Sequence, residues 1–445
     1  MQDWQSKSAS ELGREIAAGK TDPRELTDAF LATIDTNPDR DRIYARTTPD
    51  RARAEAAAAA ERAANGNLKG PLDGVPISWK DLYDTKGVAT EGGTRLLKGR
   101  VPETDCTVLQ RATAAGTICL GKTHTTELAF SGLGVNPMTA TPPNAIEPAR
   151  APGGSSSGAA VSTKLGLAAA GIGSDTGGSV RIPAGWNDLV GLKTTAGLIQ
   201  TDGVIALSRT YDTVGPLTHT VEDAANLYAI LADHPMPEWE GAALTDETLH
   251  VSKTMTLDGC DPEVTDAFQA TLDLLGKAGA KITDGQVPEF QACFDTMRNV
   301  SPLVTSDAWA EWGDVIEANP DTMWPPIEMR FRQGRNADPA KDAEGFAQMD
   351  AHSASLQQRI QDHGLIVLPT SPCMPPDAKR LEEDQDFFTE RNLLALRNTR
   401  LANLLVLSSI TVPTPSPMCG FMLFAPPHAE ERLLRIGRAL EKVLR

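Results

Sequence analysis

Two glycine-rich loops, each carrying serines, constrain this chain more than any other feature. The first, GGSSSG, covers residues 153–158 and contains Ser155, and the second, GSDTGGSVRIPA, covers residues 173–184 and contains Ser179. These two serines are 24 residues apart. Glycine lets a backbone turn sharply and approach another group, so hydroxyls set among glycines can reach a ligand with little steric shielding. The pair of loops therefore predicts a fold that presents two serines to a ligand.

The segment between the loops argues against a flexible Gly/Ser linker. Residues 159–161 and 165–170 form an apolar, alanine-rich run, which predicts a buried helix. A linker is not normally followed by such a run and by a second glycine-rich loop. We therefore expect ordered loops on either side of a core element.

The length and charge of the chain bound its class. Its 445 residues are 40% apolar, which is enough for one large α/β domain or for two or three average domains. The formal net charge of −17 comes from 59 acidic and 42 basic residues. An acidic surface repels phosphate backbones, so direct nucleic-acid binding is disfavoured, whereas small polar or neutral substrates remain open.

Cysteine and histidine usage predicts neither a metal site nor a cofactor. The six cysteines are scattered singly, and the seven histidines lack the spacing of metal ligands. Residues 1–7 have no basic start followed by an apolar run, and no apolar stretch approaches about 20 residues. We therefore expect no membrane association and a cytoplasmic location.

Helix signals dominate the N-terminus. Ser8 and Glu11 form a capping box for a first helix, and Asp22 followed by Pro23 starts a second. The alanine-rich segment 51–64 predicts a third helix that stops before an Asn-Gly pair. Three helices are thus predicted before any strand.

Apolar runs bounded by turn residues alternate with helices in the rest of the chain. Strands are predicted at 74–80 and at 117–120, with a helix at 107–115 between them. The alternation returns late, with strands at 365–368 and 421–424. Because these strands come from distant parts of the chain, we predict one α/β domain with a mixed, mostly parallel sheet of about ten or eleven strands covered by helices.

We divide this single domain, residues 1–445, into four parts, since no repeat or composition break marks a second domain. The part at 236–360 is rich in Trp, Pro, Met and charge and is expected to lay helices and loops over the sheet. The four parts are the N-terminal helices (1–65), the core with the serine loops (66–230), the substrate-covering region (236–360) and the C-terminal completion of the sheet (361–445).

Two familiar motif patterns occur, but their context excludes both. Residues 116–123 match the phosphate-binding pattern G-x-x-x-x-G-K-[ST], yet this segment is itself a predicted strand and follows a helix. Residues 154–158 match G-x-S-x-G, which would make Ser156 the nucleophile of an α/β-hydrolase. That motif must cap a buried strand, whereas the preceding residues 142–152 contain four prolines. We expect neither nucleotide hydrolysis nor a Ser-His-Asp triad.

Lys80, at the end of the predicted strand 74–80, offers a different chemistry together with Ser155 and Ser179. A serine hydroxyl is a poor nucleophile until a base takes its proton. A buried lysine is poorly solvated and can lose its own proton to become that base. A lysine taken alone is more often solvated or structural, so this hypothesis depends on the fold bringing the three side chains together.

These residues resemble the signature of the amidase signature family. The two loops match it at the 24-residue separation of their serines, and residues 74–81, GVPISWKD, match its lysine segment. The resemblance covers most of residues 8–230 and thin patches near 365–370 and 403–440. It implies a single domain with a large mixed sheet and a Ser-cisSer-Lys triad. Ser179 is the implied nucleophile, Ser155 the bridging serine after a cis peptide bond, and Lys80 the base.

The resemblance also implies an oxyanion hole made of backbone N–H groups in the second loop. Bare backbone lets such donors approach developing negative charge, which explains the glycines physically. The implied donors are Thr176, Gly177, Gly178 and Ser179. Substrate binding is assigned to a separate short segment. Its residues are Phe130, Ser131 and Gly132.

Several positions depart from the family pattern. Thr194 stands where the family has proline, and residues 186–188, WND, replace a run of small residues and cysteine. Val406, Ser408 and Pro415 stand where glycine, proline and glycine are usual. The triad is intact, but the far wall of the pocket differs, so the substrate of any one family member does not transfer.

The leading functional hypothesis is a freestanding hydrolase of small-molecule amide, carbamate or urea-like C–N bonds. The alternative is the glutaminase-type component of a tRNA-dependent amidotransferase, which needs partner proteins and a glutamine pocket. Candidates for that pocket are Arg330, Arg332, Asp307 and Asp314. Candidates for an apolar pocket are Trp309, Trp312 and Phe331. The altered C-terminal third favours the freestanding enzyme over the amidotransferase component. The complete triad argues against an inactive scaffold. The sequence leaves the oligomeric state open, and a homodimer is one possibility.

Overall fold

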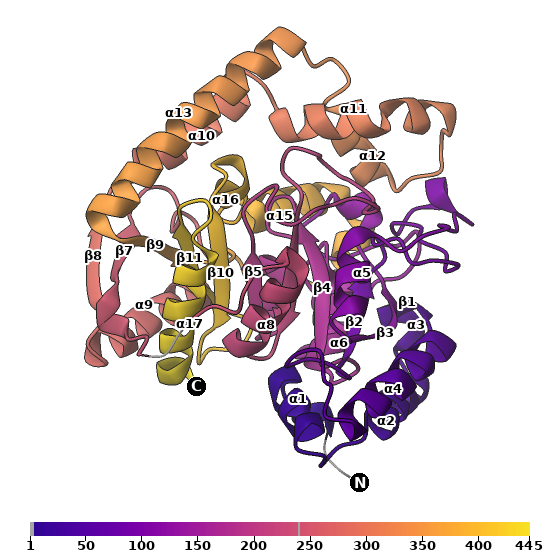
Figure 1. Cartoon of the computed structure of the whole chain (residues 1–445). Helices are drawn as coiled ribbons and strands as arrows, with labels where there is room; N and C mark the ends of the chain where they lie inside the picture. Colours follow the sequence, from indigo (N-terminus) through magenta and orange to yellow (C-terminus); the bar gives the residue numbers. More distant parts are fainter. Residues whose placement is uncertain (1–3, 239–240) are drawn as a thin grey trace.

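The computed structural model describes residues 4–238 and 241–445, and these residues contain one sheet of eleven strands. The strands lie in the order β1-β3-β2-β4-β6-β5-β10-β11-β9-β7-β8, which runs across the molecule in Figure 1. Their bounds are β1 Tyr44–Thr47, β2 Pro76–Lys80, β3 Ile118–Thr123, β4 Ala170–Asp175, β5 Val190–Lys193, β6 Thr213–Thr218, β7 Thr248–Ser252, β8 Lys281–Gly285, β9 Leu365–Pro369, β10 Ser408–Pro413 and β11 Gly420–Ala425. The prediction of one α/β domain whose sheet joins distant segments is confirmed.

The sheet is mixed, but the prediction that it is mostly parallel is wrong. Six of the ten strand pairings are antiparallel, and the four parallel ones join β3-β2-β4 and β9-β7-β8. Alternating helices and strands suggest parallel neighbours only when successive strands also lie side by side. Here Lys193 of β5 pairs with Ser409 of β10, and no local pattern reveals a pairing at that distance.

The N-terminal helix signals are confirmed, but the order of elements is not. Ser8 and Glu11 form the predicted capping box of α1, and Asp22 caps α2 through the N–H of Arg24. However, β1 lies before the alanine-rich helix, which therefore does not precede the first strand as expected, and the third helix before β1 is instead the four-residue α3, Arg40–Ile43. At four residues, β1 is too short to show an alternating pattern, and it pairs with β3 at the edge of the sheet.

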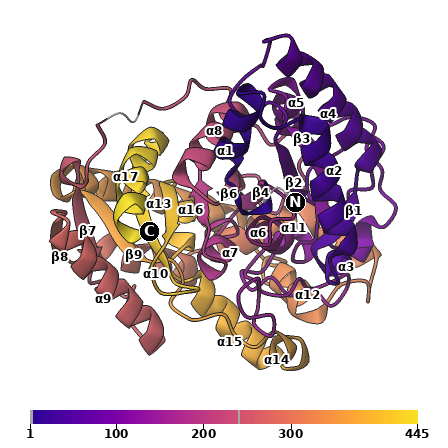
Figure 2. The ribbon, with the colours of Figure 1, turned by 90° about the horizontal axis from the view of Figure 1, so that it is seen from below.

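Helices cover both faces of this sheet, as the view from below in Figure 2 shows. The α-helices are α1 Ala9–Ala17, α2 Pro23–Thr36, α3 Arg40–Ile43, α4 Pro49–Ala64, α5 Thr107–Ala114, α6 Ser157–Lys164, α7 Arg181–Trp186, α8 Val221–Ala232, α9 Pro262–Lys277, α10 Pro288–Asn299, α11 Leu303–Ala318, α12 Pro325–Arg332, α13 Pro339–His363, α14 Ala378–Glu383, α15 Gln385–Leu396, α16 Arg400–Leu404 and α17 Glu430–Leu444. Short 3-10 helices are η1 Trp4–Ser6, η2 Arg95–Leu97, η3 Glu127–Ala129 and η4 Leu244–Asp246. No helix in the described residues is both long and apolar enough to cross a membrane.

The run between the two serine loops is split between a helix and a strand. α6 ends at Lys164, and residues 165–169 form the turn into β4 rather than more helix. Every residue of β4 is buried. Apolar periodicity does not separate a buried helix from a buried strand, which explains why the predicted helix was too long.

The region 236–360 does more than cover the sheet. Helices α11 to α13 form an arch above the strands, drawn in orange in Figure 1, as expected. The same region also contributes β7 and β8 at one edge of the sheet, which the sequence did not indicate. β8 is mostly exposed, so it lacks the apolar run by which the other strands were recognised.

The two rejected motifs lie where their context predicted. Most of the phosphate-loop pattern is the buried strand β3, in which Lys122 Nζ donates to the carbonyl oxygen of Tyr83 at 2.6 Å. Residues 142–152 contain no strand, only an isolated bridge at Arg150. The first serine loop therefore does not cap a buried strand.

The central strands set the stability of the domain, and Leu368 of β9 tests this. Its side chain is fully buried, and it pairs with Met422 of β11. We expect Leu368→Ala to lower the free energy of unfolding by about 2–5 kcal/mol, since it leaves a cavity in a packed core. Urea unfolding followed by tryptophan fluorescence measures this. Val101→Ala, at a residue that is 53% exposed, is the control, and an equal effect in both variants would contradict this view of the core.

Candidate active site

Strands β2 and β4 place Lys80 beside the start of the second serine loop. The two strands are parallel neighbours, with Trp79 paired to Ile172, so their carboxyl ends meet at one edge of the sheet. Lys80 is the last residue of β2, and its Nζ lies 2.9 Å from Ser174 Oγ near the end of β4. The loop that contains Ser179 follows β4 directly.

The Lys80 side chain is fully buried among neutral hydroxyls. Its Nζ donates to Ser155 Oγ at 2.6 Å and to Ser174 Oγ at 2.9 Å. Burial lowers the pKa of Lys80 to about 7, against the opposing effect of the negative charges of Asp212 and Asp175. A large fraction of this lysine is therefore neutral near pH 7 and can accept a proton.

The two serine loops lie against each other. The N–H of Ser156 donates to the carbonyl oxygen of Ser179 at 3.1 Å, and the peptide bond between Gly154 and Ser155 is cis, as the resemblance implies. Ser155 is fully buried, whereas Ser179 lines a cavity. The described residues show no hydrogen bond between the hydroxyls of Ser155 and Ser179. The fold nevertheless places the loop of Ser179 against the loop of Ser155, whose hydroxyl contacts the fully buried Lys80, and Ser179 lies at the cavity wall.

Close backbone contacts explain two glycines of the first loop. A Cβ atom on Gly153, whose φ is +77°, would lie 2.7 Å from Pro183 Cα, and one on Gly154 would lie 2.5 Å from Gly134 N. Neither position has room for a side chain. This tight packing fixes the backbone that carries Ser155.

A buried ion pair shapes the second loop. Asp175, at the end of β4, is bound by Arg181 Nη2 at 2.9 Å, and both side chains are fully buried. The same carboxylate accepts the N–H of Gly178 at 2.8 Å and the N–H of Val180 at 3.1 Å, on either side of Ser179. Burial alone would raise the pKa of Asp175, but Arg181 outweighs it and holds that pKa below its usual range.

The four predicted oxyanion donors differ in whether their N–H groups are already hydrogen-bonded within the protein. The N–H of Gly178 is engaged with Asp175, so it is not free for a ligand in this conformation. The N–H groups of Gly177 and Ser179 have no hydrogen-bond partner in the described part of the chain. Thr176 and Gly177, like Ser179, line the cavity. Free backbone N–H groups at a cavity wall can stabilise negative charge on a ligand bound there.

Asp212 is an additional charged group near Lys80. It accepts the N–H of Leu207 at 2.8 Å and the hydroxyl of Thr176. Burial raises the pKa of Asp212 to about 6, while its hydrogen bonds and Lys80 act in the opposite direction. Its charge raises the pKa of Lys80, so the protonation of the two groups is coupled.

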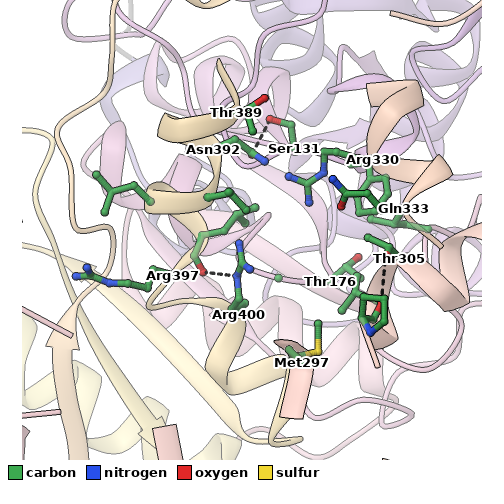
Figure 3. A pocket seen from close by; sticks show the side chains of 18 of the residues that line it. Ser131, Thr176, Met297, Thr305, Arg330, Gln333, Thr389, Asn392, Arg397 and Arg400 are labelled. Carbon is green, nitrogen blue, oxygen red and sulfur yellow. Dashed lines mark hydrogen bonds between the residues drawn. The ribbon is translucent and has the colours of Figure 1, made fainter. Parts of the chain in front are cut away.

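Ser179 and Thr176 line a cavity of about 870 Å³. Figure 3 shows this cavity from close by, with Thr176 labelled. Phe130 and Ser131 line it, as assigned from the sequence, but Gly132 does not. The N–H of Gly132 instead donates to Asn392 Oδ1 at 2.9 Å, which holds the segment against α15. Ser131 Oγ donates to the same oxygen at 3.0 Å.

Most of the other pocket candidates do not line this cavity. Trp312 donates to the carbonyl oxygen of Ala206, and Phe331 packs behind Phe130 with ring centroids 4.7 Å apart. Arg332 pairs with Glu328 on its own helix. Trp309, Asp307 and Asp314 are also absent from the cavity wall, whereas Arg330 lies on it. Each absent residue is one whose sequence pattern also fits an ordinary packing or surface role.

Sequence reasoning missed several groups in the site. Nothing in the sequence placed the carboxylate of Asp212 near Lys80. Ser174 stood inside the recognised loop without a role. Arg400 and Asn403 had no local signal, because only the folded chain brings α16 to the second loop, where Asn403 Nδ2 lies 3.0 Å from Asp175 Oδ1.

Metal ligands do not gather in the described residues. They contain no group of three or more His, Cys, Asp or Glu side chains placed to hold a metal ion.

Comparison with known proteins identifies relatives over nearly the whole chain. The Amidase family model matches residues 25–434. A 2-amino-5-chloromuconic acid deaminase of Comamonas testosteroni is 32% identical, over 98% of this chain and 97% of that relative. The A subunit of the glutamyl-tRNA(Gln) amidotransferase of Chloroflexus aggregans is 30% identical, over 96% of this chain and 94% of that relative.

A solved amidase crystal structure shares the fold. Its TM-score is 0.87 at 27% sequence identity, and the alignment covers 99% of this chain and 100% of that one. The similarity includes the sheet and the helices that carry the candidate site.

The buried amine makes stability depend on pH in a way that Lys80→Met removes. The pKa of Lys80 falls from an ordinary 10.5 to about 7 on folding, so between these values the unfolded chain holds a proton that the folded chain lacks. Stability from this group therefore rises with pH across that window and is lost as pH falls toward 7. We expect the unfolding free energy of Lys80→Met minus that of the wild type to fall by up to about 1.4 kcal/mol per pH unit there. Denaturant titrations between pH 7 and 10 measure it, and a difference independent of pH would contradict the lowered pKa.

Proposed function

The chain belongs to the Amidase family and is a hydrolase of C–N bonds, and we propose that it cleaves a small-molecule amide, carbamate or urea-like bond through Ser179, Ser155 and Lys80. The observation that carries this proposal is the 2.6 Å contact between Lys80 Nζ and the Ser155 hydroxyl, beside the loop of Ser179. A buried amine with a pKa near 7 is suited to general-base catalysis at neutral pH.

Acylation begins with proton transfer in this proposal. Neutral Lys80 takes the proton of Ser155, and Ser155 takes the proton of Ser179 as the Ser179 oxygen attacks the carbonyl carbon. The negative charge that forms on the carbonyl oxygen is stabilised by the free N–H groups of Gly177 and Ser179. The C–N bond then breaks as the proton returns through Ser155 to the leaving nitrogen, which leaves an ester on Ser179.

Deacylation uses the same groups with water. Water attacks the ester carbonyl while its proton passes through Ser155 to Lys80. Collapse of the second tetrahedral intermediate breaks the bond to Ser179 Oγ, which regains its proton, and the acid is released. No metal or cofactor takes part in this proposal, because the serine and lysine supply both the nucleophile and the base.

The runner-up is the glutaminase-type component of a tRNA-dependent amidotransferase, the kind of enzyme that the relative in Chloroflexus aggregans belongs to by name. The relative in Comamonas testosteroni is instead a deaminase by name, so similarity alone does not decide between a freestanding enzyme and an amidotransferase component. Glutamine needs a partner for its α-amino group as well as for its α-carboxylate. No aspartate or glutamate in the described residues lines the cavity, which favours the freestanding hydrolase.

Release of ammonia or amine by the purified chain tests both hypotheses. The panel is L-glutamine, aliphatic and aryl amides, ureido compounds and an aryl carbamate. Turnover of an amide or carbamate by the chain alone supports a freestanding hydrolase. Activity on glutamine only, or only after partner proteins are added, would favour the amidotransferase component.

Ser179→Ala should abolish turnover without disturbing the fold, because it removes only the attacking oxygen. Steady-state assays and circular dichroism measure the two effects. Ser157→Ala is the matched control, since the Ser157 hydroxyl lies in the first loop and donates to the carbonyl oxygen of His124 at 3.3 Å. Residual activity above a few per cent in Ser179→Ala would remove this residue from the role of nucleophile.

The pH dependence of kcat/KM should report the base. We expect activity to rise with pH through an apparent pKa near 7 as Lys80 loses its proton. Asp212→Asn removes a negative charge that raises the pKa of Lys80, so the midpoint should move to lower pH. An unchanged midpoint in Asp212→Asn would contradict the coupling, and a Lys80→Ala variant that keeps the wild-type profile would contradict a lysine base.

A further inference from the structure

The cavity in front of Ser179 carries positive charge although the chain as a whole is strongly acidic. The formal net charge of the chain is −17. Four arginines line the cavity, and no aspartate or glutamate of the described residues does. These arginines are Arg298, Arg330, Arg397 and Arg400. Because charges of one sign in a cleft attract ligands of the opposite sign, the cavity favours an anion although the net charge of the chain is negative.

Two of the four arginines are not matched by the protein itself. Arg330 Nε and Arg400 Nη2 are buried without a hydrogen-bond partner, and neither side chain forms an ion pair in residues 4–238 and 241–445. Their other contacts are with uncharged groups. The guanidinium carbon of Arg330 lies 4.5 Å from the centroid of the Phe130 ring, and Arg400 Nε donates to the carbonyl oxygen of Leu396 at 3.2 Å. Both residues are partly buried, and a cation that loses part of its water is costly unless an anion meets it.

The other two arginines have different surroundings. Arg397 donates to the carbonyl oxygens of Thr256 and Asp258, which fixes it against the loop after β7. Arg298 is exposed. Of the four arginines, Arg330 and Arg400 are therefore the ones with a buried donor that is left without a partner.

Arg330 and Arg400 face the same space from two different helices. Figure 3 shows their guanidinium groups directed into one part of the cavity, from α12 and α16. Burial lowers the pKa of Arg330 to about 9, and the like charge of Arg400 contributes to that shift. Two guanidinium groups that repel each other are both stabilised by one anion between them, and the planar fork of arginine matches a carboxylate.

The rest of the wall indicates the body of the ligand. Apolar side chains that include Phe130, Phe294, Met297 and Leu396 surround the arginines. An ammonium group would find no carboxylate of the described residues on this wall. The cavity thus combines an anion site with an apolar surface and disfavours a zwitterionic amino acid.

We propose that the substrate carries a carboxylate, held by Arg330 and Arg400, on an apolar body whose C–N bond lies at Ser179. This proposal rests on the proposed function and names the substrate class of the same site. Monoamides of dicarboxylic acids are the simplest members of that class. Hydrolysis of such a monoamide with water yields the dicarboxylate and ammonia.

Three substrates that differ only at the far end of the chain test the charge preference. They are adipic acid monoamide, which ends in a carboxylate, hexanamide, which ends in a methyl group, and the analogue of hexanamide that ends in an ammonium group. We expect kcat/KM for the carboxylate substrate to exceed that of each of the others by about 10- to 100-fold, as charge-assisted hydrogen bonds allow. Succinic and suberic acid monoamides extend the series if the chain length does not suit the cavity.

Substitutions of the arginines test whether Arg330 and Arg400 cause the preference for the carboxylate substrate. Arg330→Met and Arg400→Met should each remove most of the preference by lowering kcat/KM for the carboxylate substrate, while hexanamide is affected only a few-fold. Arg332→Met is the matched control, because Arg332 lies on the same helix as Arg330 but pairs with Glu328 and does not line the cavity. It should keep the preference of the wild type.

The outcomes separate this proposal from the proposed function. Equal or faster hydrolysis of hexanamide, or an equal loss on all three substrates in the arginine variants, would overturn the carboxylate site and leave the hydrolase. If no amide is hydrolysed, calorimetry with adipate on Ser179→Ala decides. Binding that is lost in Arg330→Met but kept in Arg332→Met, each made in the Ser179→Ala background, supports the carboxylate site on its own, and no binding of adipate overturns it.

Discussion

The burial of Lys80 is the constraint on which the rest of the site depends. An amine deep in a protein keeps its charge only if an anion lies against it, and here its direct partners are the hydroxyls of Ser155 and Ser174. This environment lowers its pKa toward 7. The parallel pairing of β2 and β4 puts Lys80 at the edge where the second loop begins, and the tightly packed glycines of the first loop bring Ser155 to it. In the proposed mechanism, the same contacts that destabilise the ammonium create the base.

A second interaction links the loop of Ser179 to the C-terminal part of the chain. The carboxylate of Asp175 accepts hydrogen bonds from two backbone N–H groups of the loop. Arg181 neutralises the charge of this carboxylate, and Asn403 donates a further hydrogen bond to it. Asn403 lies on α16, the short helix that also begins with Arg400 at the cavity wall. The position of the loop and the charge of the cavity therefore depend on one helix, so a shift of α16 would affect both the order of the loop and the anion site.

Sequence patterns correctly predicted those parts of the fold that depend on interactions between residues close together in the chain. The capping box at Ser8 and the proline start at Pro23 are confirmed, because a cap depends on neighbouring residues only. The direction of the strands and the edge strand β8 were not predicted correctly. Strand direction is set by pairings such as that of Lys193 with Ser409, and β8 is largely exposed. The loops of Ser155 and Ser179 were recognised because glycine and serine patterns survive in the sequence itself.

By itself, the sequence determined that the chain has two serine loops and a strand that ends in a lysine. The glycines, their spacing and the apolar flanking residues that indicate these elements are local features of the sequence. Only the tertiary structure decided that Lys80 is buried beside Ser155 and that Asp212 lies near it. It also decided that Arg330 and Arg400 share one cavity, to which no acidic side chain of the described residues contributes. The pKa of an amine and the charge of a cavity are sums over groups that lie far apart in the chain. They are fixed only when the sheet and α16 bring those groups within a few ångströms of one another.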